Sequence, residues 1–227
     1  MLALFGLAGC TSDAENKALH VVEKFYGGHA TYLKGSHFSA NAREPQGKFL
    51  QLSLGDVDFA STYGTDLEVP AANCAYLLYH QMTAAERTAY DYLSIKLIEG
   101  QASHTLPFSM ASLALADQGV SRLTTIMAAL QRQDYQYVVA RLDPAAFGAT
   151  SPGNMPPRLA AITQQLTPLA SYQLLGYARV NGRTPSQHNL RFYLTVPGPT
   201  KPRALWLTLN PRLGPNDPFL IGLHLFN

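Results

Sequence analysis

The fold of the second half of this chain follows from residues 190–196, which read Leu190-Arg191-Phe192-Tyr193-Leu194-Thr195-Val196. From Leu190 onward every second residue is a large apolar one, and a period of two is that of a half-buried β-strand. Residues 219–226 alternate in the same way, with Phe219, Ile221, Leu223 and Leu225 predicted on one face. Turn sequences such as Asn181-Gly182 separate the strands. The sequence therefore predicts four antiparallel strands, over residues 172–180, 190–196, 204–209 and 219–226.

Three segments whose sequence predicts helices precede these strands. Residues 113–131 form a predicted amphipathic helix, because apolar side chains recur every three or four positions, at Val120, Leu123, Met127 and Leu130. Gln133-Asp134-Tyr135 begins a second predicted helix, and a third lies around residues 159–166. This order of elements, with Gln133-Asp134-Tyr135 as its motif-like piece, resembles the nuclear-transport-factor-2-like superfamily over residues 113–227.

The resemblance implies a curved antiparallel sheet that wraps around helices as a cone. The superfamily includes isomerases, dehydratases and ligand carriers, so the fold alone assigns no activity. None of its catalytic arrangements can be matched here position by position, and no catalytic residue is carried over. We expect an α+β protein of two subdomains, the second of them cone-like.

The first half predicts a smaller α+β subdomain over residues 10–112. A capping box at Ser12 and Glu15 opens a helix that Gly27-Gly28 ends. Residues 35–47 are predicted as a loop, and Phe49 to Leu54 as the first strand. A helix begins near Pro70, and a hairpin joins strands at 92–98 and 104–110.

The chain opens on an apolar stretch that ends in Leu7-Ala8-Gly9-Cys10. A short apolar segment closed by small residues is typical of a secretory signal. These four residues resemble the lipobox of bacterial lipoproteins, which implies that residues 1–9 are a cleaved signal peptide and that the Cys10 sulfur carries lipid. The stretch lacks the usual Lys or Arg, so an ordinary N-terminal apolar strand is the alternative interpretation. The resemblance places the chain in a bacterial cell envelope, at the outer membrane in a Gram-negative host because Thr11 follows the cysteine.

Composition limits the partners. The 227 residues are 47% hydrophobic and 14% charged, with a net charge of +2, which predicts a folded protein. Lys and Arg are scattered rather than clustered in a stripe, so we expect no nucleic-acid partner. Cys74 is the only cysteine besides Cys10. We interpret it as a small buried hydrophobe without a disulfide.

Motifs for catalysis and cofactors are absent from the sequence. It contains no Gly-x-Ser-x-Gly, Gly-x-x-x-x-Gly-Lys, His-Glu-x-x-His or Cys-x-x-Cys. The seven histidines show no i, i+4 pair that would place two metal ligands on one helix face. Asp56, Asp58, Asp66 and Glu68 lack calcium-loop spacing, and we interpret them as a surface loop. We therefore predict no catalytic residue, metal or cofactor.

Three side chains are candidates for ligand binding, namely Tyr193, Trp206 and His224. Each alternates with the aliphatic residues of its strand. If their face lines the concave side of the cone, they share a pocket, where an imidazole among aromatic rings can bind ligands or act as an acid or base. The alternative is that they decorate the outer face of the sheet. Arg179, Arg191 and Arg203 are a second candidate group, for an anion or for a solvated charged face.

The function predicted from these observations is a non-catalytic binding or interaction module, held at a membrane by its lipid. Its expected partners are the membrane and either a small apolar ligand or an envelope protein, and the outer sheet face is a candidate homodimer contact. The alternative is a cone-type enzyme, an isomerase, dehydratase or hydrolase for a small apolar substrate. A pocket that joins His224 to an acidic partner would favour the enzyme.

Overall fold

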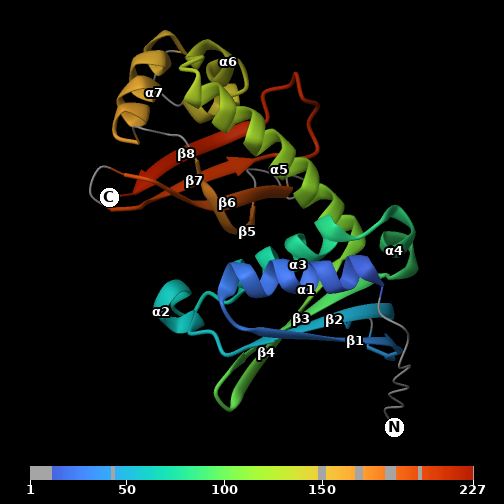
Figure 1. Ribbon diagram of the computed structural model, residues 1–227. Coiled ribbons are helices and arrows are strands. Elements are labelled where there is room, and N and C mark those ends of the chain that lie inside the picture. The colour runs from blue at the N-terminus through green and yellow to red at the C-terminus, as the bar shows by residue number, and fades with distance from the viewer. Residues whose placement is uncertain are drawn as a thin grey trace. The chain divides into compact units, whose positions relative to one another are not determined.

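The computed structural model describes residues 12–41, 44–147, 152–166, 171–181, 188–198 and 201–226 (Figure 1). It shows an α+β protein, as the sequence predicts, and its strands form two open four-stranded sheets. The chain divides into two compact units, residues 1–114 and 115–227, and the division falls inside the long helix α5 (Met110–Gln131). Each unit contains one of the sheets.

Unit 1 places two helices on one face of sheet A. Its elements are α1 (Asp13–Tyr26), β1 (His29–His37), β2 (Gly47–Gly55), α2 (Phe59–Tyr63), α3 (Glu68–Gln81), α4 (Ala84–Ala89), β3 (Tyr92–Glu99) and β4 (Ala102–Ser109). The strand order is β1-β2-β3-β4, and only the β2–β3 pair is parallel. That pair is parallel because the helical crossover through α3 returns the chain to the same end of the sheet.

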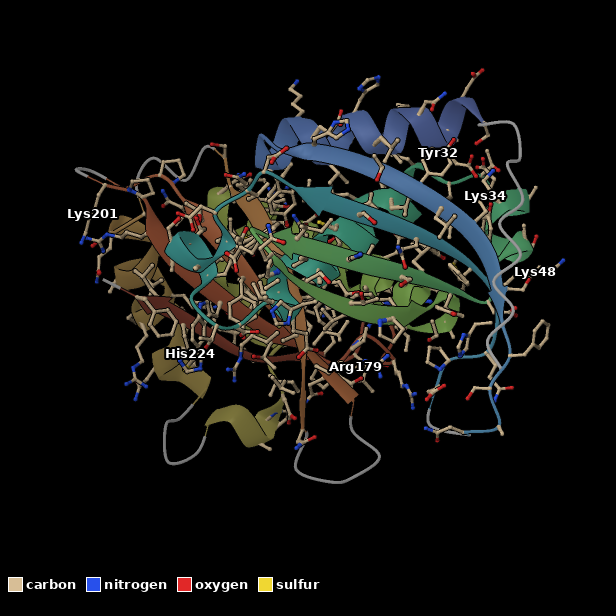
Figure 2. The ribbon with its side chains drawn as sticks, turned by 90° about the horizontal axis from the view of Figure 1, so that it is seen from below. Tyr32, Lys34, Lys48, Arg179, Lys201 and His224 are labelled. Carbon is tan, nitrogen blue, oxygen red and sulfur yellow. The ribbon has the colours of Figure 1, made fainter. Side chains whose placement is uncertain are left out.

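Strand β1 corrects the predicted loop at residues 35–47. It extends to His37, and the loop begins only at Phe38. The strand lacks an apolar alternation because one inward position is a lysine: the ammonium of Lys34 lies 2.9 Å from the carboxylate of the buried Glu15 in α1 (Figure 2). The inward face of β1 is therefore held partly by an ion pair, which a search for hydrophobic period cannot detect.

The buried carboxylate of Glu15 is also the acidic member of a capping box at the start of α1. Its Oε2 accepts a hydrogen bond from the backbone N–H of Ser12 at 3.0 Å, and its Oε1 accepts one from the Tyr90 hydroxyl at 3.2 Å. The Ser12 hydroxyl donates in turn to the carboxylate of Glu86, the acidic residue of a second capping box at the start of α4. The capping box predicted at Ser12 is thus confirmed, and it ties α1 to β1 and α4.

Unit 2 follows the predicted order of helices and then strands. Its elements after α5 are α6 (Tyr135–Ala140), the 3-10 turns Pro144–Phe147 and Pro152–Asn154, α7 (Met155–Gln164), β5 (Gln173–Asn181), β6 (His188–Val196), β7 (Arg203–Leu209) and β8 (Leu220–Phe226). Sheet B has the order β5-β6-β7-β8 and is antiparallel throughout. All four predicted strands of the second half are therefore confirmed.

Helix α5 lies close to the inner face of sheet B, and one glycine makes this possible. A Cβ added to Gly119 would stand 2.6 Å from Cζ of Phe192, well inside van der Waals contact. Phe192 is fully buried, as are its strand neighbours Leu194 and Val196. The space between α5 and the inner face of sheet B is thus filled by side chains, as expected of a close-packed core.

A bulge in β8 changes one face assignment. Between Thr208 and Leu209 the register shifts, so that Leu220 rather than Ile221 lies opposite Leu209. Leu223 and Leu225 keep the inward positions that the alternation predicts. Ile221 is the extra residue of the bulge, so it has no partner in β7. The extra residue also places Leu220 on the inner face, opposite Leu209.

Candidate functional site

The three predicted ligand-binding side chains lie in one row on the outer face of sheet B. Tyr193 of β6 pairs with Trp206 of β7, and Trp206 pairs with His224 of β8. The rings of Tyr193 and Trp206 meet edge to face at 5.1 Å, and Phe226 lies 4.0 Å from Trp206 on its other side. We call Tyr193, Trp206, His224 and Phe226 the aromatic row. Alternation with Leu225 already places Phe226 on the face of His224, but only the pairing of β8 with β7 brings its ring to Trp206.

Polar atoms beside the aromatic row lack hydrogen-bond partners. The guanidinium of Arg191 lies over the Trp206 ring at 5.2 Å, and its Nε is buried without an acceptor among the described residues. Oδ1 of Asn189, two residues earlier on the same face, is likewise buried without a donor. Buried polar atoms are nearly always satisfied in folded proteins. This face therefore offers the Arg191 cation and several ring surfaces to a bound molecule.

The predicted arginine group does not form. In the register of sheet B, Arg191 lies opposite Thr208 on the outer face, whereas Arg179 lies opposite Leu190 and Arg203 opposite Val196, both inner positions. Figure 2 shows Arg179 well apart from His224. The sequence did not reveal this, because all three arginines alternate with aliphatic residues. Only the pairing between strands decides which face of the sheet each of them occupies.

A cavity of about 400 Å³ adjoins the aromatic row at the edge of β8. His224 lines it, whereas Tyr193 and Trp206 do not. Its walls are Ile221 to His224 of β8 and one face of α7, with Leu142 and Leu220 at one end. Arg158 is the charged side chain among its described lining residues, and none of them is acidic. We call this cavity the β8 groove.

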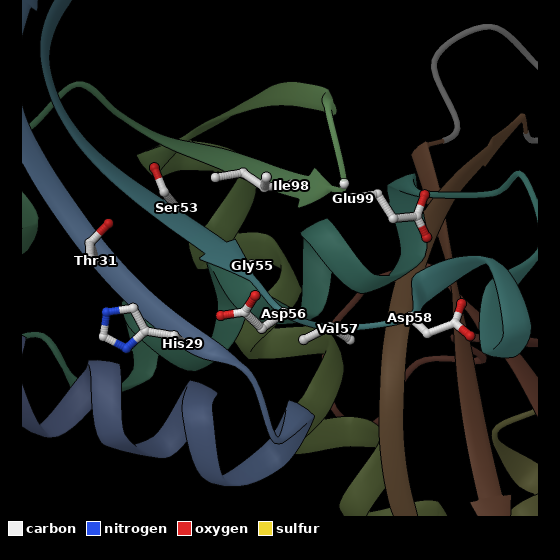
Figure 3. Close-up of a pocket in the computed structure, with 10 residues that line it drawn as sticks. His29, Thr31, Ser53, Gly55, Asp56, Val57, Asp58, Ile98 and Glu99 are labelled. Atoms are coloured by element: carbon white, nitrogen blue, oxygen red, sulfur yellow. The ribbon is translucent and has the colours of Figure 1, made fainter.

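A second cavity, of about 530 Å³, lies at one end of sheet A in unit 1 (Figure 3). Asp56, Asp58 and Glu99 line it, together with His29. Two of the carboxylates are already engaged: Glu99 accepts from the N–H of Ala60 at 2.8 Å, and Asp58 accepts from the N–H of Ser61 at 3.0 Å. Within the described ranges, no three His, Cys, Asp or Glu side chains gather closely enough to hold a metal ion.

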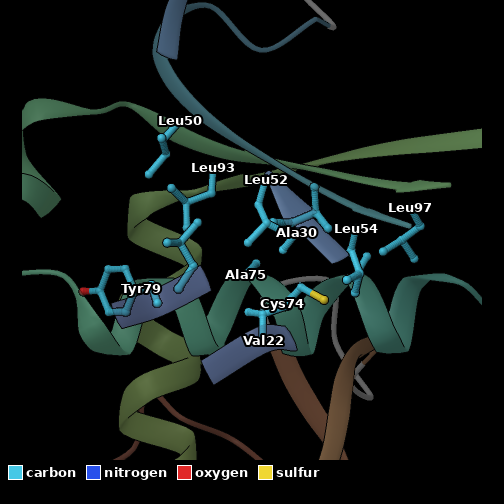
Figure 4. Packing of buried hydrophobic residues seen from close by; sticks show 14 of the residues in the cluster. Val22, Ala30, Leu50, Leu52, Leu54, Cys74, Ala75, Tyr79, Leu93 and Leu97 are labelled. Atoms are coloured by element: carbon cyan, nitrogen blue, oxygen red, sulfur yellow. The ribbon is translucent and has the colours of Figure 1, made fainter. Parts of the chain in front are cut away.

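Cys74 lies in the core of unit 1, as its apolar setting predicts (Figure 4). Desolvation by burial is the main cause that raises the pKa of its thiol to about 12. A thiol of that pKa carries almost no thiolate near neutral pH, so Cys74 is not an activated nucleophile.

The lipobox, with Cys10, falls outside the described residues. No helix in the described part of the chain is both long and apolar enough to cross a bilayer. Compared with known proteins, the chain matches no family model, no curated protein and no solved structure.

Proposed function

We propose that this chain is a cell-envelope lipoprotein that acts as a binding module, with the outer face of sheet B as its ligand surface. The observation that carries the proposal is the aromatic row together with Arg191. Three aromatic rings and an imidazole lie side by side there, and Phe226 is 39% exposed. Rigid aromatic side chains next to an arginine are the residues that dominate binding surfaces.

The surroundings of His224 favour binding over acid–base catalysis. A cone-type isomerase or dehydratase would need a second titratable group facing the imidazole. Within the described part of the chain, the charged side chain that shares its cavity is Arg158, and a guanidinium does not exchange its proton near neutral pH. The inner face of sheet B is filled around Phe192. A ligand would thus bind on the sheet rather than inside it.

Lipidation of Cys10 provides the first test. When the full gene is expressed in a bacterial host, the mature N-terminal peptide is expected to begin at Cys10 and to carry acyl chains. Mass spectrometry of that peptide measures both. Each buried methylene contributes about 0.8 kcal/mol of membrane affinity, so the two or more chains hold the protein at the membrane. The Cys10→Ser variant is expected to leave the membrane fraction, and an unmodified Met1 terminus would contradict the lipoprotein proposal.

Fluorescence of the single tryptophan provides the second test. Trp206 lies within the proposed surface, so its emission reports binding there without a label. Anilinonaphthalenesulfonate, an aromatic anion, is the probe because its rings match the aromatic side chains and its sulfonate matches Arg191. We expect Tyr193→Ala and Arg191→Met each to weaken its binding about tenfold, the equivalent of roughly 1.4 kcal/mol.

The matched control is Arg212→Met, which removes an exposed arginine from the same unit. It is expected to bind the dye as the unaltered chain does. Circular dichroism establishes that each variant is folded, since the dye also binds partly folded proteins. Equal affinity of the unaltered chain, Tyr193→Ala and Arg191→Met would show that the dye, and with it the proposed ligand class, binds elsewhere.

A further inference from the structure

The start of α1 is fixed to the rest of unit 1, and it lies very close to Cys10 along the chain. The N–H of Ser12 donates to Oε2 of Glu15 at 3.0 Å, and the N–H of Glu15 donates to the Ser12 hydroxyl at 3.1 Å. The same hydroxyl donates to the carboxylate of Glu86 in α4. Only Thr11 separates Ser12 from Cys10. Two residue steps span at most about 7 Å, so a lipid on Cys10 would bring this point of the fold to the bilayer surface.

The register of sheet A decides which other residues lie at that end. Helix α1 runs alongside β1 in the opposite direction, so β1 ends where α1 begins (Figure 1). The ion pair of Lys34 with Glu15 fixes this alignment. His37, the last residue of β1, lies opposite Gly47, the first residue of β2. We call this end of unit 1 the anchored end, and its residues include Ser12, Phe38, Lys48 and Thr83.

Phe38 is the most exposed large apolar side chain of the anchored end. Its ring is 84% exposed, whereas no other large apolar side chain among the described residues exceeds 39%. Phe38 lies four residues past Lys34, about 13 Å along an extended chain. Ser12 lies three residues before Glu15, about 5 Å along a helix. The ring therefore projects farther than the point where the tether leaves the fold, and nearly all of its apolar surface is available for transfer from water to lipid.

The opposite end of unit 1 is acidic. Asp56, Asp58 and Glu99 line the cavity there (Figure 3). His29, at that end of β1, is eight residue steps from His37, which is about 26 Å of strand. The negative potential of anionic lipid headgroups falls off within roughly 8 Å at physiological ionic strength. With the anchored end at the bilayer, the three carboxylates are therefore held beyond the reach of that repulsion.

We infer that the anchored end of unit 1 lies against the lipid bilayer, with the Phe38 ring inserted at the level of the headgroups and the acidic cavity turned towards water. The short tether fixes which end of the unit meets the membrane, and the ring adds a second contact beside the lipid. The inference rests on the proposed lipidation of Cys10. It is independent of the aromatic row, which the dye test examines.

Quenching by lipids measures which end of unit 1 is near the membrane. The lipidated chain is bound to vesicles of phosphatidylethanolamine and phosphatidylglycerol that contain a spin-labelled lipid. A fluorophore is attached either at Ala40→Cys, two residues from Phe38, or at Gln101→Cys, in the turn beside the acidic cavity, and both positions are exposed. Cys74 is buried and does not compete for the label. The label at position 40 is expected to lose more than half of its emission, and the label at position 101 to lose little.

Matched variants separate the ring from the tether. Phe38→Asp should at least halve the quenching at position 40, because a charged side chain does not enter lipid. Ser103→Asp adds the same charge at an exposed position of the acidic end and should leave that quenching unchanged. Ten Gly and Ser residues inserted between Thr11 and Ser12 lengthen the tether by about 17 Å on average. Combined with Phe38→Asp, this insertion should make the quenching of the two labels equal.

The outcomes distinguish this inference from the proposal on which it rests. Equal quenching of the two labels, or stronger quenching at position 101, in a chain whose N-terminal peptide carries lipid would overturn the inference and leave the lipoprotein proposal in place. An unmodified Met1 terminus would overturn both. Unchanged quenching at position 40 in Phe38→Asp would show that the ring does not insert.

Discussion

Replacement of Phe192 by Ala is expected to lower the free energy of unfolding of unit 2 by about 3–5 kcal/mol. The Phe192 ring is fully buried and lies 5.9 Å from the ring of Tyr177. The nearest part of α5 is Gly119, which has no side chain to fill the space that the ring would leave. The cavity therefore stays open, and the loss should fall in the upper part of the range. Urea denaturation followed by circular dichroism measures it.

The neighbouring residue on the same strand is the matched control. Tyr193 points to the outer face and is only partly buried. Tyr193→Ala is expected to cost about 1 kcal/mol, chiefly the edge contact with Trp206. It should impair dye binding, whereas Phe192→Ala impairs folding. Gly119→Ala should destabilise the unaltered chain. Combined with Phe192→Ala, it should lower the free energy of unfolding by less, because the close contact with the Phe192 ring is then gone. Equal losses at 192 and 193 would contradict the assignment of the two faces.

Replacement of Lys34 by Met is expected to lower the free energy of unfolding of unit 1 by about 3 kcal/mol. Removing one partner of a buried ion pair costs roughly 3–5 kcal/mol, because the other charge remains buried without compensation. Glu15 is only 2% exposed, but the Lys34 side chain is 22% exposed and water screens part of the interaction, so the lower end of that range applies. Denaturation curves at neutral pH measure the difference.

Two further variants isolate the ion pair. Lys17→Met removes an exposed lysine from α1 and should change stability by no more than about 0.5 kcal/mol. Glu15→Gln combined with Lys34→Met removes the stranded charge and should recover much of the loss, although the amide satisfies Ser12 and Tyr90 less fully. A double variant no more stable than Lys34→Met alone would show that packing, not charge, causes the effect.

The pH dependence of this contribution has a definite sign. Partial burial lowers the pKa of Lys34, but the hydrogen bond to Glu15 and the neighbouring charges outweigh that effect, and the net pKa is raised above its ordinary value of 10.5. A group whose pKa is raised by folding stabilises the protein fully below its unfolded pKa. The contribution of Lys34 is therefore constant through neutral pH and is lost only as the pH rises through the raised value. On the alkaline side of neutral pH, the unaltered chain and Lys34→Met should converge in stability as the pH passes that value.

The sequence predicted the strands of sheet B better than those of sheet A. Strands β6 and β7 alternate apolar and polar residues, because one face packs against α5 while the other does not. Strand β1 shows no such alternation, since its inward and half-buried Lys34 pairs with Glu15. The period of apolar residues along a strand indicates burial by hydrophobic packing. It gives no signal where an ion pair occupies the inward position instead. The bulge in β8 was not predicted for a related reason. One extra residue hardly changes the composition of the strand and shifts only its pairing with β7.

By itself the sequence determined the α+β class, the order of helices and strands in unit 2, and the strand positions of Tyr193, Trp206 and His224. These follow from residue spacing along one segment, which is local information. Only the tertiary structure decided that the three side chains are adjacent, that Phe226 and Arg191 join them, and that Arg179 and Arg203 do not. Pairing between strands is set by contacts among distant residues, and no single strand encodes the position of its neighbour.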